Sequence, residues 1–307
     1  MTKEILYKID SLYRDQFRVT GYTFGEGEKA LCVVGSIRGN EIQQIYTCAH
    51  LIRTLKKLEE EGKIVPGKQI LVIPSCNPYS MNIEKRFWPT DNTDINRMFP
   101  GYDMGETTQR IAAGIFDRVK DYANGIQLAS FYMPGEFMPH VRMMQTGFEN
   151  IELAKEFGLP YVVRRHTRPY DTTTLNYNWQ IWETNAFSLY TTGTDHIDRE
   201  GAQLGLEAIL SFMTRRGMLK DGFVNRLESQ VVEDVDLVTA RAGKAGIFER
   251  YVRTGQTVQK GQLLACILSP YDGEALEEIM APVKGTVFFA SDQPLTYSST
   301  AVFKLIP

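Results

Sequence analysis

The turn after the first strongly apolar run of the chain carries two side chains that could do chemistry, Arg38 and Glu41. Residues 30–34 read Ala-Leu-Cys-Val-Val, and Gly-Ser-Ile-Arg-Gly-Asn-Glu follows as residues 35–41. A carboxylate accepts hydrogen bonds and can ligate a metal, whereas a guanidinium has five N–H donors, a permanent positive charge and no lone pair for a metal. Because the two residues are three apart, we predict that they pair and place positive charge in a ligand site.

The strands and the helix predicted around this turn indicate where in the fold it lies. The run 30–34 is typical of a short buried strand, and a helix through Tyr46 and Leu51 follows and ends at Gly62. A second buried strand follows at residues 69–74. Short apolar strands separated by helices predict a mixed, largely parallel sheet flanked by helices. Ligands of such folds bind at the carboxyl ends of the strands, where the turn would lie.

A long loop at residues 75–101 follows the second strand and carries Arg86, Asn96 and Arg97. Structureless connections of this length inside a compact domain are usually functional. A guanidinium pairs two N–H groups with the two oxygens of a carboxylate, so these residues suit an anionic ligand. The alternative is that Arg97 pairs with Asp94 and only pins the loop.

The turn and the loop resemble two motifs of the succinylglutamate desuccinylase/aspartoacylase family of zinc hydrolases. The family turn is Gly-x-His-Gly-x-Glu, and its loop carries Asn-Pro, a basic residue and then Asp-Leu-Asn-Arg-x-Phe-Pro-Gly. The loop positions that match are Asn77, Pro78, Arg86, Asp94, Asn96, Arg97, Phe99, Pro100 and Gly101. The resemblance spans nearly the whole chain. It implies a zinc carboxypeptidase-like fold, with Arg86, Asn96 and Arg97 holding a substrate carboxylate and polarising the scissile carbonyl.

The chain departs from the family at the positions that carry its zinc chemistry. Arg38 and Ala129 stand where the family has its two histidine ligands, and Gln127 replaces a nearby acid. Tyr190 takes the place of the general-base glutamate, and a phenol with a pKa near about 10 is a poor substitute for it. Glu41 alone keeps a ligand position. A catalytic zinc needs three protein ligands, so we predict no metal and no confident catalytic residue.

The remaining candidate groups leave alternatives open. His140, in a Pro-His-x-Arg stretch, is a candidate ligand-binding residue, although a lone histidine is more often a packing residue. The histidines that show no metal-ligand spacing are His50, His140, His166 and His196. A rebuilt metal site at His140 or His166 stays open. Cys76 lies at the end of a strand, which is a position that a nucleophile could occupy. No base can be assigned to it, and an inert buried thiol is the alternative.

Two later segments are distinctive. Residues 164–172 form a basic, aromatic and threonine-rich loop that could line the mouth of a pocket for an acidic ligand, or be a solvated lid or an oligomer contact.

We predict a carboxypeptidase/deacylase-like α/β domain at residues 1–225 and a β-rich cap at 226–307 that resembles a biotinyl/lipoyl-like hammerhead. A prosthetic-group carrier needs a hairpin lysine, and residues 261–282 contain none. The cap is therefore predicted to be structural.

Composition excludes several classes of protein. The 307 residues include 34 Lys+Arg and 37 Asp+Glu, for a formal charge of −3, so no cationic patch suggests nucleic acid. The four cysteines are scattered without a Cys-x-x-Cys pair, which is typical of a reducing compartment. Neither a signal core nor a membrane-length apolar run is present. We expect a cytoplasmic protein, with homo-oligomerisation left open.

Together these observations predict a protein that binds a small anionic amino-acid or N-acyl-amino-acid-like ligand without zinc-dependent hydrolysis, and no cofactor. The alternative is an active hydrolase that cleaves an amide or ester of an acidic small molecule, through a rebuilt zinc site or metal-free chemistry. Whether the chain is an enzyme is left open by the sequence.

Overall fold

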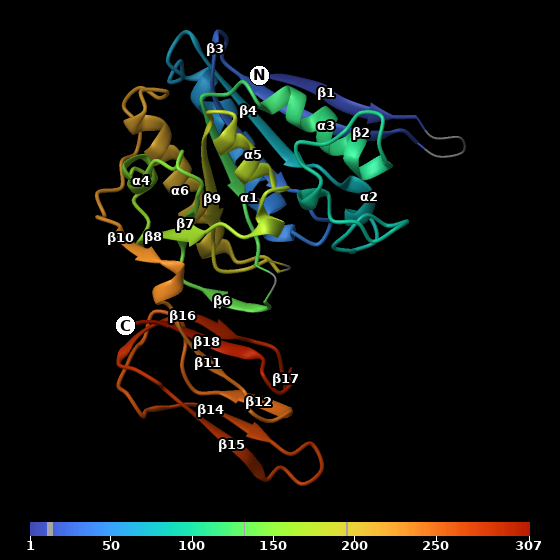
Figure 1. Cartoon of the computed structure of the whole chain (residues 1–307). Helices are drawn as coiled ribbons and strands as arrows, with labels where there is room; N and C mark the ends of the chain where they lie inside the picture. Colours follow the sequence, from blue (N-terminus) through green and yellow to red (C-terminus); the bar gives the residue numbers. More distant parts are fainter. Residues whose placement is uncertain (11–14, 132, 195) are drawn as a thin grey trace.

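The computed structural model describes residues 1–10, 15–131, 133–194 and 196–307, and its upper part in Figure 1 is built on one large sheet. In spatial order the sheet strands are β1 (Thr2–Ile9), β2 (Phe17–Phe24), β4 (Lys68–Ser75), β3 (Glu28–Ser36), β5 (Asn124–Leu128), β9 (Asn185–Tyr190), β7 (His140–Gln145), β8 (Tyr161–His166) and β10 (Gln230–Glu233). The pairs β4–β3–β5–β9 and β7–β8–β10 are parallel, while β1–β2, β2–β4 and β9–β7 are antiparallel. The prediction of a mixed, largely parallel sheet is confirmed.

Helices cover both faces of this sheet. They are α1 (Ile42–Glu60), α2 (Pro78–Met81), α3 (Thr107–Val119), α4 (Ile151–Lys155), α5 (Leu175–Ile181) and α6 (Arg199–Arg215). Side chains of β3 alternate between the two faces: Leu31 and Val33 pack in the core with α1 and α6, and Cys32 and Val34 pack in the core with α3 and α5. A strand buried on both faces must be apolar throughout, which explains the uninterrupted run at residues 30–34.

The C-terminal part consists of antiparallel β-sheets, as expected (Figure 1). One sheet contains β11 (Val238–Arg241), β18 (Ala301–Ile306), β16 (Gly285–Ser291) and β13 (Thr257–Val258), and the other contains β15 (Ala275–Met280), β14 (Leu263–Leu268), β12 (Gly246–Arg250) and β17 (Leu295–Thr296). The two sheets enclose a separate apolar core. Strand β10 belongs to the large sheet, and the antiparallel sheets begin with β11. The boundary between residues 225 and 226 stays a prediction.

The two parts of the chain are joined by backbone pairing as well as by side chains. Strand β6 (Gly135–Phe137) leaves the α/β part and pairs antiparallel with β16. Arg250 Nη2 also lies 3.1 Å from Glu136 Oε1 across this contact. The C-terminal sheets are therefore fixed against the edge of the α/β part where β3, β5 and β9 end.

No helix within the described ranges is both long and apolar enough to cross a membrane. The expectation of a cytoplasmic location stays a prediction.

Candidate ligand-binding site

A cavity of about 650 Å³ lies between the carboxyl edge of the large sheet and the C-terminal sheets. Its polar wall contains six cationic side chains: Arg38, Arg97, Arg142, Arg165, Arg168 and Lys304. Two carboxylates, Asp171 and Asp234, share that wall. The low formal charge of the whole chain hides this local excess of positive charge, which suits an anionic ligand.

Arg38 lies at the bottom of the site in a buried ion network. Its side chain is 4% exposed. Nη1 donates to Glu41 Oε1 at 3.1 Å, and Nε and Nη2 donate to Asp94 Oδ2 at 3.2 and 2.8 Å. Burial lowers the pKa of Arg38, but the carboxylates of Glu41 and Asp94 outweigh this effect and raise it. The predicted pairing of Arg38 with Glu41 is confirmed, and Asp94 joins it from the loop at residues 75–101.

The carboxylate of Glu41 is fully occupied by its own chain. Oε2 accepts from the backbone N–H groups of Ile37 and Arg38 at 2.9 and 3.0 Å. Oε1 accepts from Arg38 Nη1 and from the hydroxyl of Ser130. These four donors match the four acceptor positions of a carboxylate, so no lone pair is left for a metal. Glu41 lies beneath Arg38 and does not line the cavity.

Aromatic side chains line the same cavity. The rings of His140 and Tyr190, which are register partners on β7 and β9, stack with centroids 4.8 Å apart and an interplanar angle of 3°. Phe131 lies 4.2 Å from the Tyr190 ring, and the Arg142 guanidinium carbon lies 4.4 Å from it. At this distance a guanidinium is attracted to the ring face. Tyr190 therefore orients Arg142.

His140 is held neutral in this wall. It is buried, its Nδ1 lies 2.8 Å from the carbonyl oxygen of Met138, and burial lowers its pKa to about 3. Nearby Arg142 lowers the pKa further, although the Met138 hydrogen bond opposes the shift. Since Nδ1 faces a carbonyl, it carries the ring proton and Nε2 is left as an acceptor.

Acidification should therefore destabilise the protein through His140. Its pKa in the unfolded chain is about 6.5, so the unfolded state binds the proton first and the free energy of unfolding falls as the pH drops from about 6.5 toward 3. Between about pH 7 and pH 4, the free energy of unfolding of His140→Gln should fall by roughly 2–4 kcal/mol less than that of the wild type, as measured by urea unfolding at each pH. His166→Gln, at an exposed histidine, should follow the wild-type curve. Parallel curves for wild type and His140→Gln would contradict this role.

Most of the predicted site residues meet in the cavity. Arg38, Asn96, Arg97 and His140 line it together with the family-variant positions Gln127, Ala129 and Tyr190. Arg97 Nη1 donates to the Asn96 carbonyl oxygen at 2.9 Å, and its guanidinium carbon lies 6.0 Å from the Tyr170 ring centroid. Arg86 instead lines a neighbouring cavity of about 460 Å³, which shares Phe131 and Met133 with the first. Ligand binding by these residues stays a prediction.

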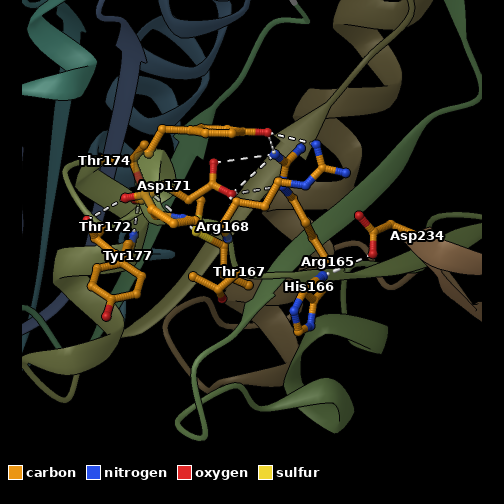
Figure 2. A network of polar contacts seen from close by, with 12 residues as sticks. Arg165, His166, Thr167, Arg168, Asp171, Thr172, Thr174, Tyr177 and Asp234 are labelled. Atoms are coloured by element: carbon orange, nitrogen blue, oxygen red, sulfur yellow. Dashed lines mark hydrogen bonds and ion pairs between the residues drawn. The ribbon is translucent and has the colours of Figure 1, made fainter.

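The loop at residues 164–172 reaches the same cavity. Arg165, Arg168, Tyr170 and Asp171 line it, and Figure 2 shows the polar contacts of Arg165, Arg168 and Asp171. Arg165 Nη2 lies 3.2 Å from Asp171 Oδ2, and Arg168 Nη1 donates to the Tyr170 hydroxyl at 2.9 Å. The loop is thus braced internally and presents cations to the cavity, as the interpretation of a pocket mouth requires.

Cys76 lacks the surroundings of a reactive thiol. It is buried, and burial raises its pKa, with the Glu41 charge acting in the same direction. A protonated buried thiol is a weak nucleophile.

The family model for the succinylglutamate desuccinylase/aspartoacylase catalytic domain matches residues 27–213. The chain belongs to this family. It is 22% identical over 273 residues to N-alpha-acetyl-L-2,4-diaminobutyric acid deacetylase of Halomonas elongata, covering 80% of this chain and 72% of that protein.

Solved structures of family members share the fold. A succinylglutamate desuccinylase from Silicibacter sp. superposes with a TM-score of 0.82 at 18% identity, covering 99% of this chain and 92% of that one. The product-bound ectoine utilization protein EutE (DoeB) from Ruegeria pomeroyi gives 0.81 at 19% identity, covering 99% and 94%. The desuccinylase/aspartoacylase fold therefore extends through the C-terminal sheets.

Sequence reasoning did not assign three charged residues to the cavity: Arg142, Asp234 and Lys304. Arg142 stands in the Pro-His-x-Arg stretch, where its nearness to His140 was a usable signal. The sequence around Lys304 does not indicate a place in the cavity, because that place depends on how β18 packs against the α/β part.

Proposed function

We propose that the chain binds a small anionic amino-acid or N-acyl-amino-acid-like ligand in the 650 Å³ cavity without zinc-dependent hydrolysis. The observation that carries the proposal is the Arg38 network. A guanidinium, paired on both sides with carboxylates, occupies the turn that provides metal ligands in the family, while cations line the space above it.

The residues present do not fit a zinc ion. Arg38 and Ala129 offer no lone pair, and the four acceptor positions of Glu41 are filled by its own chain. Within the described ranges, no group of three or more His, Cys, Asp or Glu side chains could hold a metal.

Binding of an anion is supported by the rest of the wall. Arg97 and Asn96 lie side by side on η1 (Ile95–Arg97), whose start is capped by the Asp94 side chain through the Asn96 N–H at 3.0 Å. The Asn96 side-chain oxygen accepts from the Leu175 N–H at 3.1 Å, so its amide nitrogen is turned away from that contact. A fixed guanidinium beside an amide donor suits a carboxylate.

Arg97→Ala should weaken binding of N-acetyl-L-glutamate and N-acetyl-L-aspartate, used as probes in isothermal titration calorimetry. Loss of a charge-assisted hydrogen bond costs about 1.5–3 kcal/mol, which corresponds to a Kd raised roughly 10–100-fold. Arg226→Ala, at an exposed arginine, is the matched control and should bind as the wild type does. An unchanged Kd in Arg97→Ala, or no binding of either probe by the wild type, would overturn the proposal.

A further inference from the structure

One sheet of the C-terminal part, β15-β14-β12-β17, lies at the end of the molecule away from the large sheet (Figure 1). Its side chains Phe248, Ile267 and Ile279 belong to the apolar core between the two C-terminal sheets. Side chains along a strand alternate between the two faces of a sheet, so the residues next to these three point outward. The outer face of this sheet is therefore turned away from the core of the C-terminal part.

An apolar row crosses this outer face from strand to strand. Ile247 on β12 is the register partner of Leu295 on β17 and of Leu268 on β14. The Cβ atoms of such partners lie about 5 Å apart, so the three side chains form one row. Leu295 is 62% exposed and Ile247 is 37% exposed, and the exposed Leu276 lies next to the register partner of Leu268 on β15. A contiguous exposed apolar surface of this kind is typical of an interaction site.

Negative charge borders the apolar row. Glu249 on β12 and Glu278 on β15 are both register partners of Cys266 on β14, and both are exposed. They lie two residues along the strands from the row, which is about 7 Å. Asp272 and Glu274 add exposed carboxylates in the hairpin between β14 and β15. A partner that fits this face must therefore offer apolar side chains together with cations.

The chain itself contains a segment of the complementary kind. Residues 215–228, which we call the strap, begin at the last residue of α6 and lead to β10. The strap contains four basic and two acidic side chains, for a formal charge of +2. Phe223 and Leu227 are each 49% exposed, and Arg226 between them is exposed as well. The strap thus presents exposed apolar side chains and an excess of positive charge on one short segment.

Hydrogen bonds to Asn225 hold the strap in a fixed conformation. The Asn225 backbone N–H donates to Ser211 Oγ at 3.1 Å, and its carbonyl oxygen accepts from Arg215 Nη2 at 2.7 Å. The Asn225 side-chain oxygen accepts from the Leu227 backbone N–H at 3.1 Å. A segment that is already ordered loses less conformational entropy when it binds.

We propose that copies of this chain associate, with the strap of one copy on the outer face of another. Phe223 and Leu227 pack against the apolar row, and Arg226 between them reaches Glu249 or Glu278. The four strands span roughly 15 Å and the stretch between the two apolar side chains of the strap at most about 17 Å, so the surfaces match in length. Contacts of this size lie at the low end of specific interfaces, so we expect a Kd of roughly 10–100 μM. The association does not depend on the proposed ligand.

Sedimentation velocity at concentrations from about 1 to about 500 μM tests this association. The wild type should move from monomer toward dimer or larger species as the concentration rises. Leu295→Asp on the outer face and Leu227→Asp on the strap should each stay monomeric, with a Kd raised more than about tenfold, because each puts a carboxylate into an apolar contact. An equal mixture of the two variants should form a heterodimer, since each variant keeps the surface that the other has lost.

Ile83→Asp, at an exposed apolar residue of the α/β part, is the matched control and should associate as the wild type does. Tyr297→Asp, at an exposed position two residues after Leu295, should behave as Leu295→Asp does and decides the question if that variant does not fold. A wild type that stays monomeric throughout overturns the proposal, also if its outer face binds phosphatidylcholine vesicles instead. Association that survives both Leu295→Asp and Leu227→Asp, or a mixture of the two that stays monomeric, overturns it as well. None of these outcomes bears on the proposed ligand.

Discussion

Arg38→Met is expected to lower the free energy of unfolding by about 3–5 kcal/mol, because it removes a buried cation that forms ion pairs with two carboxylates. Glu41 is fully buried, and the Asp94 side chain is 9% exposed. Both lie within 3.1 Å of Arg38 nitrogens. The thioether of Met fills much of the same volume but can donate no hydrogen bond. The cost therefore arises from the lost ion pairs and not from a large void.

Thermal unfolding followed by circular dichroism measures this effect, with an expected fall in Tm of roughly 10 °C for a domain of this size. The triple variant Arg38→Met/Glu41→Gln/Asp94→Asn should recover much of the loss, since a neutral site has no uncompensated charge. Arg53→Met, at an exposed position of α1, serves as the control. A Tm of Arg38→Met equal to that of the wild type would show that the network contributes nothing to stability.

The sequence predicted the fold well because the fold follows from local patterns. The runs at residues 30–34 and 69–74 became the adjacent strands β3 and β4, and the glycine-rich turn came to lie at the carboxyl end of β3. The pairing of Arg38 with Glu41 could also be predicted, since the two residues share one turn.

The rest of the site depends on contacts between distant segments, which spacing cannot reveal. Asp94 was considered as a partner for Arg97. Its carboxylate accepts a hydrogen bond from Arg38, which lies 56 positions away in the sequence. Arg86 was grouped with Asn96 and Arg97 but lines the adjacent cavity. Lys304 lies on β18, next to β16 in the sheet that pairs with β6, so its place in the wall depends on contacts between distant segments.

Arg38→His/Ala129→His is expected to create a zinc site at the turn after β3. Ala129 follows β5 and lines the same cavity as Arg38, and its backbone N–H is fixed by the Leu189 carbonyl oxygen at 2.9 Å. Removal of the guanidinium frees one acceptor position of Glu41, so two imidazoles and one carboxylate could supply the three ligands of a zinc site with an open position. A Kd of about 1 μM or tighter is expected, which is roughly 8 kcal/mol of binding free energy.

The single variants Arg38→His and Ala129→His are the matched controls for this gain. Each provides one imidazole fewer and should bind zinc much more weakly than the double variant. A folded double variant that binds zinc no better than either single variant would mean that the scaffold no longer holds these positions in ligand geometry.

The metal content of the wild type, by elemental analysis of protein purified without added zinc or chelator, tests most directly whether this chain works without zinc. The proposed function predicts far less than one zinc per chain in the wild type and near-stoichiometric zinc in Arg38→His/Ala129→His prepared in parallel with zinc supplied. Near-stoichiometric zinc in the wild type would contradict the proposed function and would direct attention to His140, His166 and Glu41 as ligands of a rebuilt hydrolytic centre.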